Sequence, residues 1–337
     1  MFSLTIWLSL LSIAGAVPGA QFPHATPAPY YDARSNSGSH GKSWINYTAV
    51  PGFFLQDEAT TVPSTFDYTQ WNFGLINRTY PTDSRASNGT SQWERFEKYV
   101  TSLNKNSKKN VNYKVLFMGR HGEGWHNAAE TYYGTPAWNC YYSELDGNAT
   151  VTWADAHLDP KGIAQAQKAS NYWLSRIQLQ NIPLPNLTTP PHSIAPLIKE
   201  LFREGISGHT CDRRSNRTFI HESFPSYKIE KGFAENDPFW KALEGEVSID
   251  QDIRSKKVLD DVFGSDDHTW LSITSHSGEI ASILRVLHHQ VFSLVTGSII
   301  PVLVKAETIS GTPTSTSSLP WTSISTCTSP PANTATS

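Results

Sequence analysis

Three short runs of mainly apolar residues predict buried β-strands. The runs Tyr113–Met118 and Trp270–Thr274 each end at a glycine- and histidine-containing turn. The third run, Ser298–Val304, contains Pro301, whose missing N–H favours an edge strand. Apolar residues at helical spacing predict helices before and between these strands, over the following ranges: Trp93–Leu103, Asp159–Arg176, Ala195–Phe202 and Glu279–Phe292.

This alternation of strands and helices predicts an α/β fold with a mainly parallel central sheet. The clearest helix begins with Asp159 as its N-cap and Pro160 in its first turn. Within residues 21–105, the part up to about residue 90 has no sustained period, which predicts an irregular N-terminal extension with short elements such as Thr48–Leu55. Residues 21–306 are expected to form one domain. Residues 307–337 are rich in Ser, Thr and Pro and predict a disordered tail.

The first twenty residues indicate the compartment. Met1–Ala20 contains an apolar run that ends in small residues, which is typical of a secretory signal peptide, although no Lys or Arg precedes the run. The alternative is a buried N-terminal element in a cytoplasmic protein. Six Asn-x-Ser/Thr sequences favour secretion and glycosylation: Asn46, Asn77, Asn88, Asn148, Asn186 and Asn216. No other stretch is long and apolar enough to predict a membrane span.

Composition narrows the class of protein further. The chain has 337 residues with 27 Lys+Arg and 30 Asp+Glu, so its net charge of -3 argues against binding nucleic acid through bulk charge. An aromatic content of 12% argues against a disordered chain. The three cysteines allow at most one disulfide, and the sequence leaves open whether two of them pair, Cys140 with Cys211 included.

The candidate chemistry lies where two predicted strands end. The first strand is followed by Arg120-His121-Gly122-Glu123, and the later strand by Ser275-His276-Ser277-Gly278. Ligands of open α/β sheets bind outside the carboxyl ends of strands, and glycine lets the backbone approach a ligand closely. Arginine carries a permanent charge and binds oxyanions with two parallel hydrogen bonds. These residue types in this pattern predict a phosphate site.

Five motifs, in order between about residues 111 and 305, resemble those of the histidine phosphatase superfamily. The sequence Arg120-His121-Gly122 with Asn127 is similar to the signature of its phosphoglycerate-mutase-like branch. The other four motifs resemble this branch and its fungal subgroup in the same way: Leu158–Ala166, Lys199–Glu204, His209–Arg214 and Thr274–Gly278. The resemblance implies a three-layer α/β/α sandwich.

The resemblance also implies roles for individual residues. His121 would be the nucleophile that accepts the phosphoryl group, with Arg120 and His276 binding its oxygens. Glu204 would be the general acid. Four more residues are candidates for orienting the loop or the substrate: Glu123, Asn127, Asp212 and Arg213. Phosphoryl transfer of this kind needs no metal or cofactor, and the implied substrate is a small phosphorylated molecule.

One departure from the family pattern affects both fold and site. The family carries a Ser-Pro-x-x-Arg segment on a further strand, and its arginine binds phosphate. Residues 177–202 contain no arginine and are too short for that strand and a helix, so the sequence predicts a missing strand and a missing phosphate ligand. An error in the gene model and a real loss would both produce this. Arg203 and Arg213 are weak substitutes, because position matters as well as charge.

Other readings are weaker or remain open. His121 and His126 are five residues apart, which is not the His-Glu-x-x-His spacing of a zinc protease, so we expect no metal. The first interpretation is a phosphomonoester hydrolase. The alternatives are a catalytically impaired relative that serves as a secreted binding or surface glycoprotein, and a phosphoglycerate-type mutase.

Overall fold

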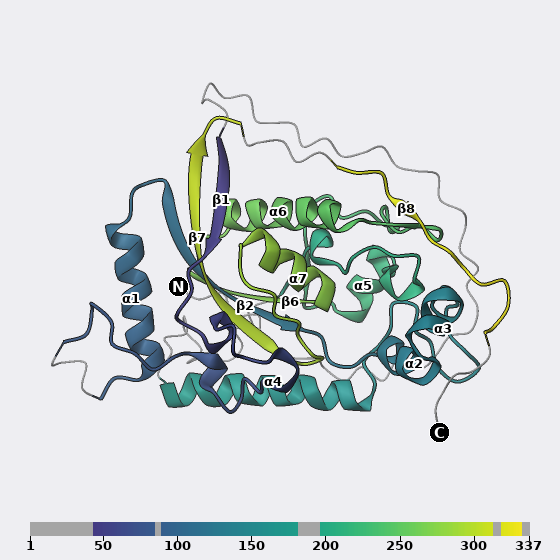
Figure 1. Cartoon of the computed structure of the whole chain (residues 1–337), viewed down its shortest axis with the longest axis horizontal. Coiled ribbons are helices and arrows are strands. Elements are labelled where there is room, and N and C mark those ends of the chain that lie inside the picture. Colours follow the sequence, from purple (N-terminus) through teal and green to yellow (C-terminus); the bar gives the residue numbers. More distant parts are fainter. Residues whose placement is uncertain (1–42, 85–88, 181–195, 313–317, 332–337) are drawn as a thin grey trace.

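The computed structural model describes residues 43–84, 89–180, 196–312 and 318–331. Helices cover both faces of a central sheet (Figure 1). Helices α1 (Gln92–Asn106) and α4 (Pro160–Gln180) pack on one face, and α6 (Ser248–Ser265) and α7 (Ser277–Val286) pack on the other. The chain therefore has the predicted three-layer α/β/α fold.

The central sheet contains four strands in the order β1-β7-β2-β6. Their bounds are β1 (Ser43–Ala49), β2 (Val111–Arg120), β6 (Trp270–Ser275) and β7 (Ile299–Ser310). Strands β2 and β6 are parallel, whereas β7 is antiparallel to both β1 and β2. The sheet is therefore mixed and not mainly parallel as predicted, because β7 runs against both of its neighbours. The parallel pair is the one that carries the two histidine motifs.

Strand β2 is apolar from Val115 to Met118 because both of its faces are covered there. Val115 and Phe117 point to the face packed by α1 and α4, and Leu116 and Met118 point to the face packed by α6 and α7. Successive side chains of a strand alternate between faces, so a strand covered on both sides is a continuous apolar run. This packing fixes the end of β2, and with it His121.

The prediction that Pro301 marks an edge strand is wrong. Strand β7 lies between β1 and β2, with Pro301 opposite Phe117. The Val50 N–H donates to the Leu303 carbonyl at 2.8 Å, so Leu303 faces β1 with its polar backbone atoms. Pro301 is two residues away and directs its nitrogen to the same side, beyond Ala49, the last residue of β1. An interior strand tolerates proline there because no neighbouring strand needs its N–H.

The N-terminal extension is more regular than predicted. Strand β1 lies within it and forms an edge of the central sheet. The aromatic residues that follow are buried in the core with α1 and α4: Phe53, Phe54, Tyr68, Phe73 and Tyr80. Apart from β1, the described residues up to 84 form only 3₁₀ turns, loops and isolated bridges, and their buried aromatic side chains complete one face of the sheet.

The predicted helix Ala195–Phe202 is also wrong. Its described part forms strand β3 (Leu197–Ile198) and a 3₁₀ turn at Glu200–Phe202. Strand β3 pairs with β4 (Lys228–Ile229), since the Lys228 N–H donates to the Pro196 carbonyl at 2.8 Å. The remaining helices are α2 (Trp125–Tyr133), α3 (Thr135–Cys140) and α5 (Arg217–Ser223).

The connection between α4 and Glu204 is the place where the sequence predicts a missing strand. Residues 181–195 lie outside the described part of the chain. On either side of them, within 160–180 and 196–204, no residue joins the central sheet, because β3 belongs to a separate two-stranded sheet with β4. The described residues thus agree with a sheet that gains no strand in this connection.

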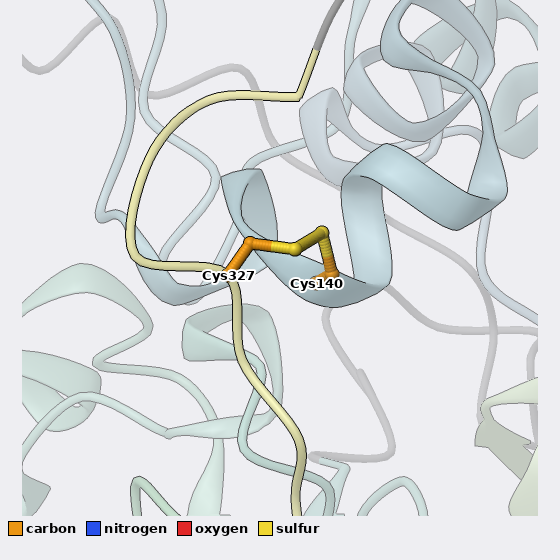
Figure 2. Close-up of a disulfide and its surroundings, with 2 residues drawn as sticks. All are labelled: Cys140 and Cys327. Carbon is orange, nitrogen blue, oxygen red and sulfur yellow. A yellow bond between two sulfur atoms is a disulfide. The ribbon is translucent and has the colours of Figure 1, made fainter.

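The Ser/Thr/Pro-rich C-terminus is held to the domain over residues 318–331, contrary to the prediction of a disordered tail. Strand β8 (Thr322–Ser323) pairs with β5 (Glu244–Gly245), and Cys327 forms a disulfide with Cys140 at the end of α3 (Figure 2). Cys211 is left as a free thiol. A covalent bond and a few backbone hydrogen bonds hold this segment without an apolar core of its own.

Three predictions about the compartment fall partly outside the described residues. The predicted signal peptide, residues 1–20, lies outside them, as do Asn88 and Asn186. Among the predicted glycosylation sites inside them, Asn77 and Asn148 are exposed. No helix within the described ranges has both the length and the apolar character needed to cross a membrane.

Candidate active site

The parallel pairing of β2 with β6 brings the two histidine motifs together. Arg120 is in register with Ser275, and the His121 N–H donates to the Ser275 carbonyl at 3.0 Å. His276 follows β6 directly, and its ring centroid lies 5.0 Å from that of His121. Since the carboxyl ends of parallel strands meet at one edge of the sheet, residues far apart in sequence form one site.

The His121 ring is oriented by its own loop. Its Nδ1 lies 2.7 Å from the Gly122 carbonyl oxygen, so a hydrogen on Nδ1 donates there and leaves the lone pair on Nε2. Burial, followed by the charges near it on His276 and Arg120, lowers the pKa of His121 to about 4. The imidazole is therefore neutral at neutral pH, which is the form that can attack an electrophile.

Arg120 and His276 supply the polar groups around His121. One Nη of Arg120 donates to the Leu294 carbonyl at 2.9 Å, while its Nε is buried without a partner. Within the described ranges, Arg120 forms no ion pair with a carboxylate. The pKa of His276 is lowered to about 4 by burial and by the nearby guanidinium groups of Arg203, Arg120 and Arg254. A partly buried cation without a counterion is an arrangement suited to an anionic ligand.

The start of α4 holds the loop that follows His121. The Gln165 side chain accepts the Glu123 N–H at 2.7 Å and donates to the Thr296 hydroxyl at 3.0 Å. Gly162 lies against the backbone of Gly122, where a Cβ on Gly122 would be 2.8 Å from the Gly162 carbonyl carbon. Gly162 and Gln165 therefore both hold the loop after His121 in place, Gly162 by backbone contact and Gln165 by hydrogen bonds.

Two further predicted residues also hold this loop. The Asn127 side chain accepts the Gly124 N–H at 3.0 Å at the start of α2. The Glu123 carboxylate forms a 2.6 Å ion pair with Lys161, whose side chain is 66% exposed. The structure thus engages both side chains in the support of the His121 loop, and Glu123 is directed to the surface of α4.

Glu204 lies at the N-terminus of α7. Its carboxylate accepts the N–H groups of Gly205 at 2.9 Å, Gly278 at 3.2 Å and Glu279 at 2.9 Å. The positive end of the helix dipole attracts this negative charge. A Cβ on Gly278 would lie 3.1 Å from the Glu204 carboxyl carbon and closer to its oxygen, so glycine is needed for this approach.

Helix α6, which the sequence did not predict, contacts the backbone of Glu204 through Arg254. Arg254 donates to the Glu204 carbonyl at 3.1 Å and forms ion pairs with Glu246 at 2.8 Å and Glu279 at 3.1 Å. Burial raises the pKa of Glu279 to about 8, against the opposing effect of Arg254. This buried network ties α6, α7 and the Glu204 segment together.

Neither of the arginines considered as substitutes for the missing phosphate ligand is free. Arg203 forms a 2.6 Å ion pair with Asp237. Arg213 forms a 2.6 Å ion pair with Asp146 and lies over the Trp240 ring at 5.0 Å. Both guanidinium groups are therefore already paired with carboxylates of the surrounding loops.

Asp212 and its neighbours form the group with metal-ligand spacing. Among the described residues, the ligand atoms of His209, Cys211 and Asp212 lie within 4.8 Å of one another. The Asp212 carboxylate accepts hydrogen bonds from the Ser207 N–H at 3.2 Å and from the Ser207 hydroxyl. Burial raises the pKa of Asp212 to about 7. The Asp212 carboxylate thus has hydrogen-bond partners within its own loop.

His126 is a site residue that sequence reasoning missed. Its ring lies in the first turn of α2, and its centroid is 5.3 Å from that of His121. The pKa of His126 is lowered to about 3 by burial and by neighbouring groups, first His121 and then His276. The sequence contains a signal for it, because His126 follows His121 by five residues in the same glycine-containing segment.

Comparison with known proteins places this site in a family. The chain is 45% identical to a "Probable phosphoglycerate mutase" of Arthroderma benhamiae, over 80% of this chain and 87% of the relative. It is 33% identical to "Phosphomutase-like protein 3" of Candida albicans, over 77% of this chain and 80% of the relative. The protein belongs to the phosphoglycerate-mutase-like family of the histidine phosphatase superfamily.

Two other comparisons add little to this assignment. No protein-family model matches the chain. A solved structure of the Thermus thermophilus protein TTHB049 covers 56% of this chain and 92% of its own length, at 16% identity and a TM-score of 0.27. The family assignment therefore rests on the sequence relatives.

Proposed function

We propose that this protein hydrolyses small phosphomonoesters through a phosphohistidine formed at His121. The observation that carries the proposal is the cluster of His121, His276 and Arg120, in which the guanidinium has no carboxylate partner among the described residues. A dianionic phosphoryl group matches this cluster in charge and in its need for hydrogen-bond donors.

The proposed reaction has two steps. In the first, Nε2 of His121 attacks phosphorus, the bond to the leaving oxygen breaks, and Glu204 gives that oxygen its proton. In the second, Glu204 takes a proton from water, the water oxygen bonds to phosphorus, and the phosphorus–nitrogen bond breaks to restore neutral His121. Arg120 and His276 stabilise the charge on the phosphoryl oxygens in both steps.

Glu204 must change partners in this scheme. In the structure its carboxylate accepts the N–H of Gly205 and two N–H groups at the start of α7. A protonated carboxyl needs fewer of these donors and has a hydrogen to give. We therefore place the proton transfer at one Glu204 oxygen while the other oxygen keeps its contact with α7.

A mutase is the second candidate, and the names of the two relatives support it. A mutase must return the phosphoryl group from His121 to a second position of the same substrate, whereas a hydrolase gives it to water. The predicted secretion favours hydrolysis, because a secreted protein has little access to the phosphorylated intermediates of the cytoplasm.

One assay tests the proposed function. Purified protein is incubated with an aryl phosphate at several pH values beside His121→Ala, and released phosphate is measured. We expect release by the parent and a loss of at least ~10³-fold in the variant, because the nucleophile is removed. Equal, background rates would refute the hydrolase and favour the binding glycoprotein. Interconversion of phosphoglycerates without phosphate release would favour the mutase.

We also propose that the protein enters the secretory pathway. The predicted signal peptide supports this, and so does the Cys140–Cys327 disulfide, since disulfides persist mainly in oxidising compartments. A C-terminally tagged chain expressed in a fungal host is expected in the medium without residues 1–20 and with a mass that falls after deglycosylation. A cytoplasmic product that retains Met1 would contradict the proposal.

A further inference from the structure

His126 stands as close to the proposed nucleophile as His276 does. The ring centroid of His121 lies 5.3 Å from His126 and 5.0 Å from His276. His126 comes from the first turn of α2, whereas His276 comes from the end of β6, so the two rings approach His121 from different elements. A phosphoryl group on Nε2 of His121 carries three oxygens within reach of such neighbours.

The ring nitrogens of His126 form no hydrogen bond within the described residues. Its Nδ1 is buried and has no hydrogen-bond partner, and the ring forms no hydrogen bond with any residue in the described ranges. Buried polar atoms of folded proteins are nearly always paired, so an unpaired one indicates strain, an unseen partner or a functional role. A histidine retained only for packing would leave this cost uncompensated.

The loop makes room for the His126 ring. A Cβ on Gly124 would lie 2.7 Å from Nδ1 and 2.8 Å from Cε1 of His126, so any larger residue at this position would displace the ring. Asn127 then fixes the Gly124 N–H and with it the start of α2. The ring is therefore held in place by its backbone surroundings although its nitrogens are unpaired.

We propose that His126 is a phosphoryl-binding residue and takes the place of the arginine that this chain lacks. This inference rests on the proposed function and deepens it. His126 donates a hydrogen bond from Nε2 to a phosphoryl oxygen, so that His126 and His276 both hold the group bound to His121. Arg203 and Arg213 do not serve this purpose, because both are held in ion pairs.

Three substitutions at one position test the proposal. His126→Gln keeps an amide nitrogen near the position of Nε2, His126→Asn places one near Nδ1, and His126→Ala removes both. The measurements are kcat and KM with an aryl phosphate, and the dissociation constant of inorganic phosphate by calorimetry. The control is His221→Gln, which changes an exposed histidine of α5 outside the proposed phosphoryl site.

We expect His126→Ala and His126→Asn to lower kcat/KM by ~10²-fold, as the loss of one oxyanion ligand does, and to weaken phosphate binding. His126→Gln should recover most of both, and the His221 control should match the parent. Thermal midpoints show whether each variant folds. If His126→Ala does not fold, the comparison of His126→Gln with His126→Asn tests the proposal, because both side chains are polar and similar in size.

The outcomes separate the two proposals. An active parent whose three His126 variants keep its kcat/KM and phosphate affinity would refute the role of His126 and leave the hydrolase intact. An inactive parent that binds phosphate in a His126-dependent way would refute the hydrolase and support this role. A parent that neither reacts nor binds phosphate would contradict both.

Discussion

Gly122→Ala tests whether close contact between the His121 loop and α4 positions the nucleophile. The added Cβ would lie 2.8 Å from the carbonyl carbon and 2.9 Å from the Cα of Gly162. Since carbon atoms pack at about 3.5–4.0 Å, the loop and the helix must separate by roughly 1 Å. Both obstacles are backbone atoms, so no side-chain rotation relieves the contact.

A shift of this size acts more strongly on catalysis than on folding. Misplacing a reacting group by about 1 Å costs ~10²-fold in rate, and overpacking costs about 1–3 kcal/mol of stability. We therefore expect Gly122→Ala to lower kcat/KM for an aryl phosphate by ~10²-fold while the protein still folds. The assay compares steady-state kinetics and the free energy of unfolding in urea.

Gly264→Ala is the matched control for this prediction. Gly264 lies in α6, and a Cβ there would meet nothing within 4 Å. The change should stabilise the protein by up to about 1 kcal/mol through helix propensity and leave the kinetics unchanged. A Gly122→Ala protein with the kcat/KM of the parent would refute the reasoning that the Gly122–Gly162 contact sets the position of His121.

Three further predictions concern charge, pH and the disulfide. Glu204→Gln should lower kcat by ~10²–10⁴-fold through loss of the general acid and cost about 0.3–1 kcal/mol at the start of α7, measured by kinetics and urea unfolding. The lowered pKa values of His121 and His276, both about 4, place the acid limb of kcat/KM near pH 4. Because the unfolded chain binds protons on these histidines between about pH 6.5 and 4 and the folded chain does not, stability should fall across that window as pH falls. Cys327→Ser should destabilise the protein by about 2–4 kcal/mol in urea, whereas Cys211→Ser should leave the disulfide and most of the stability intact.

Each of these predictions has an outcome that contradicts it. A fully active Glu204→Gln protein would mean that another residue is the general acid, and Asp212 would be the next residue to test. An acid limb near pH 6.5 would mean that His121 is not in the buried, neutral state described above. Equal unfolding midpoints for the Cys327 and Cys211 variants would mean that the C-terminal segment contributes nothing to stability.

The strands that carry the site could be predicted because their runs of apolar residues are visible in the sequence alone. Both β2 and β6 contain short runs of mainly buried apolar residues, and each strand is followed by a histidine motif. Parallel pairing of those strands then implies that His121 and His276 meet. The start of α4 was equally clear, because Asp159 accepts the Gly162 N–H at 2.7 Å as an N-cap should.

Other elements depend on contacts that no local pattern indicates. Helix α6 buries polar residues, among them Arg254 and Ser255, so its buried face does not look apolar in the sequence. Strand β1 is a single edge strand of mixed polarity whose only strand partner, β7, lies about 260 residues away in the chain. The C-terminal segment is held by Cys327, whose partner is 187 residues away. Long-range pairing determined these features.

The site shows the same division between local and long-range information. The resemblance to the family named His121, Arg120, His276 and Glu204, and the structure brings the first three together. It could not indicate that the Glu204 carboxylate sits on the N–H groups of α7, because that contact joins residues 74 and 75 positions apart. Nor did it single out His126, whose closeness to His121 is seen only in the structure.

The most direct test of the account is a search for the phosphohistidine itself. The protein is mixed with an aryl phosphate, quenched in alkali after a fraction of a turnover, digested and examined by mass spectrometry. We predict a phosphoryl group on the peptide that contains His121, stable to alkali, lost in acid and absent from His121→Ala. Phosphate release from the parent without this adduct, or with the phosphoryl group on another residue, would contradict the central claim.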